Sequence, residues 1–190
     1  MKLTKLLERL DYKVVTGSDN IEITELVNDS RKVVPGSVFV CISGAVSDGH
    51  QYVKDVAERG AAAVIVEKDV EVPEGLTVIK VENTRYALAL MSAAYFGYPA
   101  EKLKTIGITG TKGKTTTTYM VKAILEEVGH KVGLIGTIEA IIGDKTIPSN
   151  NTTPESYTIQ KYFAQMDAGA VQEIMEKALE GYFGKEAASV

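Results

Sequence analysis

The residues with the clearest chemical potential lie between 105 and 121, in the run TIGITGTKGKTTTTYMV. An apolar, strand-like segment leads into a glycine-rich turn, and an amphipathic helical segment follows in which Lys114 and Thr115 come directly after Gly113. Glycines let several backbone N–H groups point into one concavity, and the N-terminus of a helix adds partial positive charge. In such a loop the lysine reaches the β- and γ-phosphates, and the next hydroxyl joins a Mg²⁺ shell. The run therefore predicts a nucleotide-phosphate site.

The loop departs at one position from the strict phosphate-loop pattern GxxxxGK[ST], because Ile108 occupies the place of the first glycine. A strand-to-helix turn that merely contains glycines is the structural alternative. The order of strand, loop, Gly-Lys-Thr and helix favours the phosphate site. Its predicted members are Gly110, Thr111, Lys112, Gly113, Lys114, Thr115 and Thr116.

The elements that must position this loop alternate between strand-like and helix-like segments, which predicts an α/β fold with parallel sheets. Strands are expected at 21–27, 37–42, 62–66, 77–81, 105–109 and 131–135, and a hairpin at 138–147. Helices are expected at 3–10, at 51–59, after Asn83, from 113 to 128 and from about 155. Pro99 favours a boundary between two domains, 1–99 and 100–190. The final 24 residues contain no clear strand and are expected to form an atypical helical tail.

Two polar loops follow strands in the first domain. Residues 28–31, Asn-Asp-Ser-Arg, can offer the Ser30 hydroxyl and backbone groups to a ligand, or they can form a turn that satisfies its own backbone. Residues 44–47, Gly-Ala-Val-Ser, are either a second ligand loop or a plain strand-ending turn. We interpret Asp48 and His50 as organising this loop and the helix after it, and Cys41 as a buried, inert thiol.

A third candidate lies before the last helical segment, where Thr152 and Thr153 precede Pro154. Either threonine could cap that helix. Two hydroxyls and exposed N–H groups at a helix N-terminus would equally suit a carboxylate or a phosphate-linked sugar.

Composition excludes several classes of protein. The net charge of −4 leaves no basic footprint for nucleic acid. One cysteine and two histidines provide neither a disulfide framework nor a zinc cluster. No apolar run approaches the roughly 20 residues of a membrane span, and the charged N-terminus lacks a signal core. We therefore expect a cytoplasmic protein that binds neither nucleic acid nor membrane.

The form GTKGKTT at 110–116 resembles the ATP loop of the Mur ligases, which build the peptide stem of peptidoglycan, and of the related folylpolyglutamate synthases. Residues 29–50, DSRKVVPGSVFVCISGAVSDGH, look like the N-terminal uridine-nucleotide domain of the Mur ligase that adds the third stem residue. Residues 150–154, NNTTP, are similar to the segment that holds the muramoyl-peptide in that family. The resemblance covers about residues 1–166.

The resemblance implies a uridine-nucleotide-binding α/β domain followed by the first part of a P-loop central domain. It implies ATP and Mg²⁺ as cofactors, with Lys114 as the catalytic residue and Thr115 as a metal contact. The implied substrates are UDP-N-acetylmuramoyl-L-alanyl-D-glutamate and a diamino acid, which are joined by an amide bond through an acyl phosphate. The implied substrate-binding residues are Ser30, Ala45, Val46, Ser47, Thr152 and Thr153.

Three readings of the chain remain open at this stage. The first is a truncated form of such a ligase, and the second is a non-catalytic module that binds the UDP-linked substrate and ATP. The third is a generic P-loop NTPase or folylpolyglutamate-type ligase. The Asp-Ser-Arg segment argues against the last of these. The identity of the added amino acid and the oligomeric state stay open.

Overall fold

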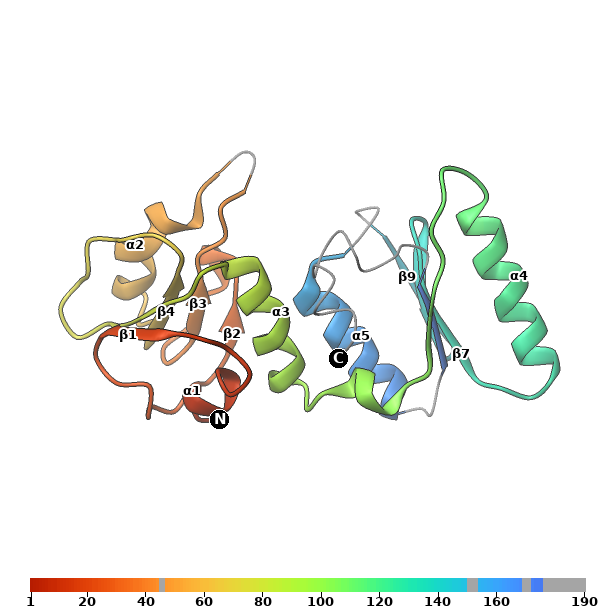
Figure 1. The fold of residues 1–190 in the computed structure, drawn as a ribbon, viewed down its shortest axis with the longest axis horizontal. Coiled ribbons are helices and arrows are strands. Elements are labelled where there is room, and N and C mark those ends of the chain that lie inside the picture. The colour runs from red at the N-terminus through yellow and green to blue at the C-terminus, as the bar shows by residue number, and fades with distance from the viewer. Residues whose placement is uncertain (45–46, 150–153, 169–171, 176–190) are drawn as a thin grey trace. The chain divides into compact units, whose positions relative to one another are not determined.

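The computed structural model describes residues 1–44, 47–149, 154–168 and 172–175. It divides into two compact units, Met1–Tyr95 and Phe96–Val190, each with its own sheet (Figure 1). The domain boundary expected from Pro99 falls a few residues after this division. The described residues contain no helix that is long and apolar enough to span a membrane.

The first unit is built on a five-stranded sheet with the order β1-β5-β4-β3-β2. Its strands are β1 (Lys13–Thr16), β2 (Leu26–Val27), β3 (Val38–Val40), β4 (Ala63–Val66) and β5 (Thr77–Lys80). Neighbouring strands from β2 to β5 run parallel, and β1 is added antiparallel to β5. The parallel sheet confirms the α/β fold that was expected from the alternating segments.

Helices cover both faces of this sheet. Helix α2 (Val53–Glu58), which continues the 3₁₀ turn η2 (Gly49–Tyr52), packs Val53 and Val56 against Phe39, Val64 and other side chains of one face. Successive strand residues point to opposite faces, so the alternate strand positions face the other side. There α3 (Thr84–Tyr95) contacts β2 and α1 (Leu3–Leu6) (Figure 1). Because both faces are covered, β3 and β4 are buried at every position.

Two differences from the expected elements have a physical cause. The strand expected at 21–27 is reduced to β2, because Ile21 and Ile23 exchange backbone hydrogen bonds with the start of the chain, at Leu3 and Met1. Strand β1 was not expected, since all four of its residues are exposed and no alternation of apolar and polar residues marks it. It forms at the sheet edge by antiparallel pairing with β5.

The second unit carries a five-stranded sheet with the order β6-β10-β7-β8-β9. Its strands are β6 (Thr105–Gly107), β7 (Val132–Ile135), β8 (Glu139–Ile142), β9 (Lys145–Pro148) and β10 (Gln172–Met175). The expected hairpin is confirmed as β8–β9, and its turn holds Gly143 at a φ of 57°. Helices α4 (Lys114–Glu127) and α5 (Ser156–Ala168) lie on opposite faces of this sheet (Figure 1).

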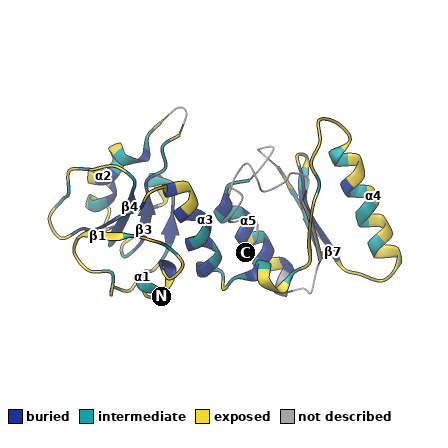
Figure 2. Ribbon diagram, in the orientation of Figure 1, coloured by how far each residue is buried: buried dark blue, intermediate teal, exposed yellow. Residues whose placement is uncertain are grey.

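The core of the second unit lies under α5. Ile159, Phe163 and Met166 pack against Ile135, Ala140 and Ile142 of the sheet, beside the 3₁₀ turn η3 (Pro99–Lys102). Gly133 allows this close approach, because a Cβ atom there would lie 2.7 Å from the end of the Met166 side chain. Helix α4 is far more exposed, and Thr118 is its buried residue (Figure 2).

Strand β10 corrects the expectation that the chain ends in a helical tail without strands. The four residues 172–175 run parallel to both β6 and β7 and separate them. Their backbone hydrogen bonds therefore come from segments more than thirty residues earlier in the chain. A local pattern of apolar residues cannot reveal such pairing.

Candidate functional site

The predicted phosphate loop joins the carboxyl end of β6 to the start of α4, where ligands of open α/β sheets commonly bind. Gly113 forms the N-cap of α4 with a φ of 78°, a conformation that favours glycine. The first amide bonded within the helix is that of Thr117, which donates to the Gly113 carbonyl at 2.9 Å. The amides of residues 114–116 precede it and have no partner inside the helix. The structure thus presents a helix N-terminus suited to an anion.

The side chains of the loop are arranged around this terminus. Lys114 Nζ donates to the Gly110 carbonyl at 2.9 Å. The hydroxyls of Thr117 and Thr118 donate to backbone carbonyls of the preceding turn, so their hydrogen bonds stay within the first turns of α4. Thr111, Lys112 and Thr116 are exposed, and Thr115 is half-buried. The predicted loop residues are therefore brought together at one open surface.

The donor chemistry of this loop is compatible with a magnesium–nucleotide complex. Mg²⁺ is usually held in proteins by one or two oxygen ligands, with phosphates and waters filling the remaining positions. Thr115, next to Lys114 at the start of α4, carries a hydroxyl oxygen suited to that role. Among the described residues, there is no group of three or more His, Cys, Asp or Glu side chains that could hold a metal ion.

A second candidate site is a cavity of about 540 Å³ in the first unit. This volume falls in the range of pockets for small ligands and cofactors. Ser30 and Ser47, predicted from two separate loops, both line it. The other lining residues are Asn28, Asp29, Arg31, Phe39, Ile42, Gly49, Tyr52, Asp55 and Arg59. Of the remaining substrate calls in this unit, Ala45 and Val46 lie outside the described residues.

The wall of this cavity after β2 is held by an ion pair. Arg31 donates through Nε and a terminal nitrogen to the two oxygens of Asp29, both at 2.9 Å. Asp29 also accepts the backbone N–H of Arg31 and so caps the 3₁₀ turn η1 (Ser30–Lys32). The side-chain hydrogen bonds from Arg31 lower the pKa of Asp29. The Asx turn that was the alternative reading is therefore present, and it leaves Ser30 on the cavity wall.

Sequence reasoning missed the helical side of the cavity. Tyr52 of η2, Asp55 of α2 and Arg59, the C-cap of α2, line it, and they are spaced three and four residues apart, as residues on one helix face are. Phe39 and Ile42 come from β3 and the segment after it. The spacing of Tyr52, Asp55 and Arg59 was the available signal, but the same spacing is equally typical of an ordinary solvated helix face.

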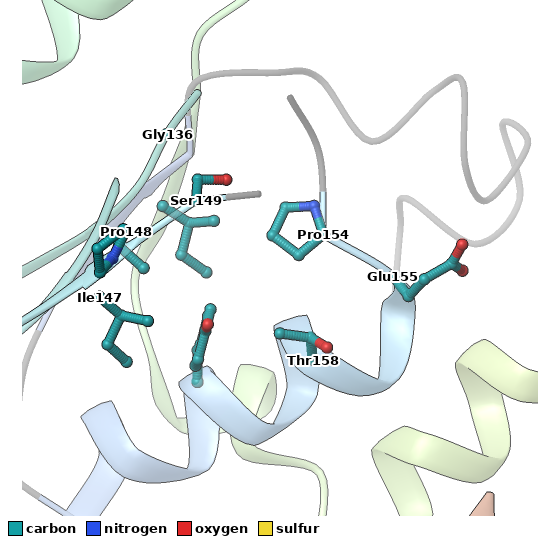
Figure 3. A pocket seen from close by; sticks show the side chains of 10 residues that line it. Gly136, Ile147, Pro148, Ser149, Pro154, Glu155 and Thr158 are labelled. Atoms are coloured by element: carbon teal, nitrogen blue, oxygen red, sulfur yellow. The ribbon is translucent and has the colours of Figure 1, made fainter. Parts of the chain in front are cut away.

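A smaller cavity of about 230 Å³ lies in the second unit (Figure 3). Figure 3 shows Pro154, which precedes α5, and Thr158 of α5 on one side of it, and Ile147 and Pro148 of β9 on the other. Thr152 and Thr153 lie outside the described residues. The residues on either side of that segment, Ser149 and Pro154, both line the cavity. The structure therefore places the two residues that flank positions 150–153 at a concave surface.

Two protein-family models match this chain. One is described as "Mur ligase family, catalytic domain" and matches residues 22–96. The other is described as "Mur ligase middle domain" and matches residues 108–185. The second match corrects the expectation that the family pattern ends near residue 166, since it includes β10 and the residues after it.

Curated relatives match along most of the chain. The UDP-N-acetylmuramoyl-L-alanyl-D-glutamate–2,6-diaminopimelate ligase of Clostridium perfringens is 48% identical over 177 residues, which are 93% of this chain and 37% of that protein. The ligase of the same name from Bacillus velezensis is 47% identical over 186 residues, 94% of this chain and 37% of that protein. The chain thus spans little more than a third of the length of these relatives.

Solved structures agree on the fold. A structure titled as a UDP-N-acetylmuramoyl-L-alanyl-D-glutamate–2,6-diaminopimelate ligase superposes with a TM-score of 0.72, covering 99% of this chain and 38% of that chain at 17% identity. MurF from Acinetobacter baumannii superposes with a TM-score of 0.56 over 92% of this chain and 34% of that chain, at 22% identity. At these identities the similarity concerns the fold alone.

Proposed function

The chain belongs to the Mur ligase family, and from that membership we propose that it carries the uridine-nucleotide and ATP sites of a ligase of peptidoglycan precursor synthesis. The proposed reaction adds 2,6-diaminopimelate to UDP-N-acetylmuramoyl-L-alanyl-D-glutamate. This is the reaction for which the relatives are named. One observation carries the proposal. A single chain combines an anion-binding loop at the start of α4 with a separate cavity lined by Ser30 and Ser47. A cytoplasmic location is part of the same proposal.

The proposed reaction must bring two anions together, the D-glutamate side-chain carboxylate and the γ-phosphate of ATP. The carboxylate oxygen attacks the γ-phosphorus, ADP leaves, and an acyl phosphate forms. The amine of the diamino acid then attacks the acyl carbon, inorganic phosphate leaves, and the nitrogen loses a proton. Lys114 and the amides of residues 114–116 would offset the charge that gathers on the phosphates in the first step.

Magnesium enters the proposal as the partner of the nucleotide phosphates. When bound, it supplies additional positive charge to the β- and γ-phosphate oxygens. Thr115 would contribute a hydroxyl ligand from the first turn of α4. Lys114 would exchange its bond to the Gly110 carbonyl for one to a phosphate oxygen.

In the first unit, the proposed ligand is the UDP part of the substrate. The Ser30 and Ser47 hydroxyls can pair with polar atoms of the uracil or ribose, and Tyr52 and Phe39 supply aromatic surface to the same cavity. Arg59 supplies positive charge that can pair with the diphosphate. These groups fit a ligand with a polar heterocycle and an anionic arm.

Calorimetric titration of the chain with UDP-N-acetylmuramoyl-L-alanyl-D-glutamate, and separately with a non-hydrolysable ATP analogue and Mg²⁺, tests the two sites. We expect saturable binding in both titrations. Absence of heat with the muramoyl nucleotide, in a sample shown to be folded by circular dichroism, would remove the uridine site from the proposal. A folate that binds in its place would favour the folylpolyglutamate-type alternative.

Turnover is tested separately, by measuring ADP release with both substrates and 2,6-diaminopimelate. Because this chain spans about 37% of its relatives, a module that binds both nucleotides without ligation is the second candidate function. ADP release that depends on both the muramoyl nucleotide and the diamino acid supports the ligase. Binding without any ADP release supports the module.

A further inference from the structure

His50 is a buried imidazole that joins two parts of the first unit. It lies in η2, and 6% of its side chain is exposed. Its Nδ1 atom lies 2.6 Å from Oδ1 of Asp48, within the same turn. Its Nε2 atom lies 3.1 Å from the backbone nitrogen of Glu67, which follows β4. The ring therefore ties the segment after β3 to the segment after β4.

These two contacts determine where the ring carries its proton. The backbone nitrogen of Glu67 can only donate, so Nε2 of His50 must be the acceptor and carries no hydrogen. In a neutral imidazole the other nitrogen then holds the proton, and Nδ1–H donates to the carboxylate of Asp48. A second proton on the ring would place an N–H of Nε2 directly against the N–H of Glu67. Protonation and this contact are therefore incompatible.

The contacts of His50 reach the cavity through its neighbours in sequence. Asp48 accepts the His50 backbone N–H and forms an isolated β-bridge with Ser43. The two residues next to Asp48 in sequence, Ser47 and Gly49, line the 540 Å³ cavity. Gly49 donates to the Ile42 carbonyl at 2.8 Å. A Cβ atom on Gly49 would lie 2.7 Å from the Ile42 nitrogen, so the backbones at Gly49 and Ile42 are tightly packed. A shift of residues 47–49 would therefore separate them from the segment after β3.

Charged groups surround the ring from each neighbouring element. Asp48 accepts from Lys68 at 2.7 Å, and the hydrogen bonds from Lys68 and His50 hold the pKa of Asp48 well below its usual range. Burial alone would raise the pKa of Glu67, but hydrogen bonds from Thr84 and Ser43 outweigh it and lower that pKa. Arg85 of α3 reaches the Ser43 carbonyl at 3.5 Å.

Cys41, which follows β3, completes these surroundings as a neutral group. Burial, with the Asp48 and Glu67 carboxylates, raises the pKa of its thiol to about 12. Asp48 and Glu67 thus stay ionised through the pH range in which imidazoles titrate, whereas the Cys41 thiol keeps its proton there. An imidazole is the side chain whose charge ordinarily changes between about pH 5 and 8.

We propose that neutral His50 is a positioning residue of the nucleotide cavity, which holds residues 47–49 in place through Asp48 and the Glu67 amide, and that its protonation opens this wall and weakens the UDP-linked ligand. The role of the cavity as a nucleotide site rests on the proposed function. The hydrogen-bond arrangement of the ring does not.

The first test uses the ¹⁵N-labelled chain without ligand. Long-range ¹H–¹⁵N spectra at about pH 8 should show the proton of the His50 ring on Nδ1. On lowering the pH to about 5, the amide resonances of Ser47 and Gly49 should move with the same midpoint as the ring nitrogens. A proton on Nε2 at high pH would overturn the proposal, even if the uridine nucleotide binds. Amide resonances of Ser47 and Gly49 that do not move with the ring nitrogens would also overturn it.

The second test measures binding of UDP-N-acetylmuramoyl-L-alanyl-D-glutamate, whose diphosphate and carboxylates keep nearly the same charge across this pH range. Affinity should fall about fivefold or more between pH 8 and 5, the size of one net hydrogen bond. His50→Gln places an amide where Nε2 lies, keeps an acceptor for the Glu67 amide and cannot titrate, so it should bind with little pH dependence. His50→Asn keeps only the donor to Asp48 and should bind weakly at both pH values.

His130→Gln is the matched control, because His130 is the second of the two histidines and is exposed after the end of α4. This variant should keep the pH response of the wild type. A pH response that survives in both His50 variants would overturn the proposal. If the nucleotide does not bind to the wild type at pH 8, the proposed uridine site fails, and the ligand-free spectra still decide the role of His50.

Discussion

In the loop between β6 and α4, the Nζ atom of Lys114 lies 2.9 Å from the carbonyl oxygen of Gly110 and donates a hydrogen bond across the turn. The lysine thereby closes the loop on itself at the start of α4. A phosphate oxygen is a stronger acceptor for an ammonium group than a neutral carbonyl, because both partners are then charged. A nucleotide can therefore take the place of the Gly110 carbonyl without any change in the backbone of the helix.

We expect Lys114→Ala to weaken binding of an ATP analogue by about 10- to 150-fold, because a hydrogen bond to a charged group contributes about 1.5–3 kcal/mol. Titration calorimetry in the presence of Mg²⁺ measures this loss. Lys122→Ala is the control on the same helix, since Lys122 pairs with Glu126 at 2.6 Å, away from the loop. Equal affinities of the wild type and Lys114→Ala would show that the loop is not the nucleotide site.

We expect Ser30→Ala to raise the dissociation constant of the UDP-linked substrate about fivefold. The reason is the loss of one hydrogen bond of about 1 kcal/mol in the cavity of the first unit. Calorimetry with UDP-N-acetylmuramoyl-L-alanyl-D-glutamate measures the change. Ser18→Ala, which alters a serine outside the cavity lining, should leave the constant unchanged. If the two variants bind alike, Ser30 does not contact the ligand.

The phosphate loop was predictable because its signal is local. Gly113, Lys114 and Thr115 follow one another, and the strand before them and the helix after them are each marked by a continuous pattern. Ser30 and Ser47 are different, since short polar turns are common and only the family resemblance selected these two as ligand residues. Their meeting at one cavity depends on the parallel pairing of β2 and β3, which aligns the loops that follow both strands.

The parts that escaped prediction depend on distant partners. Tyr52 and Arg59 line the cavity from the two ends of the short helix α2, and their spacing is that of any solvated helix face. The contact between His50 and the Glu67 amide joins residues seventeen positions apart. Strand β10 is defined by hydrogen bonds to β6 and β7 on both sides, and its own residues carry no alternation that identifies them.

A pH-dependent contribution to stability is expected from Asp48 and Lys68. The Lys68 hydrogen bond, followed by that of His50, lowers the pKa of Asp48 below its ordinary value of 3.8. The stabilisation from this carboxylate is therefore fully present above about pH 4 and is lost as the pH falls below that value. Its size should be about 1 kcal/mol, because 39% of the Asp48 side chain is exposed and water screens the pair.

Urea unfolding of the wild type and Asp48→Asn between pH 3 and 7 measures this contribution. The difference in the free energy of unfolding should shrink as the pH falls from about 4 toward 3. Lys68→Gln should reproduce part of the loss, and the double variant should lose less than the sum of the two. A difference that grows on acidification would contradict the assigned direction of the Asp48 pKa.

Proline at position 174 tests the central place of β10. Ile174 pairs with Ile106 of β6 and Leu134 of β7, so proline would remove a backbone donor from a strand that is bonded on both sides. We expect Ile174→Pro to destabilise the second unit by about 1–3 kcal/mol, because the loss of the donor leaves its carbonyl partner without a hydrogen bond. Hydrogen exchange should then accelerate for the β7 amides and stay unchanged for β4. Val15→Pro is the control, since Val15 lies at the irregularity of the exposed edge strand β1 and should be tolerated there. Unchanged protection of β7 in Ile174→Pro would place residues 172–175 outside the sheet.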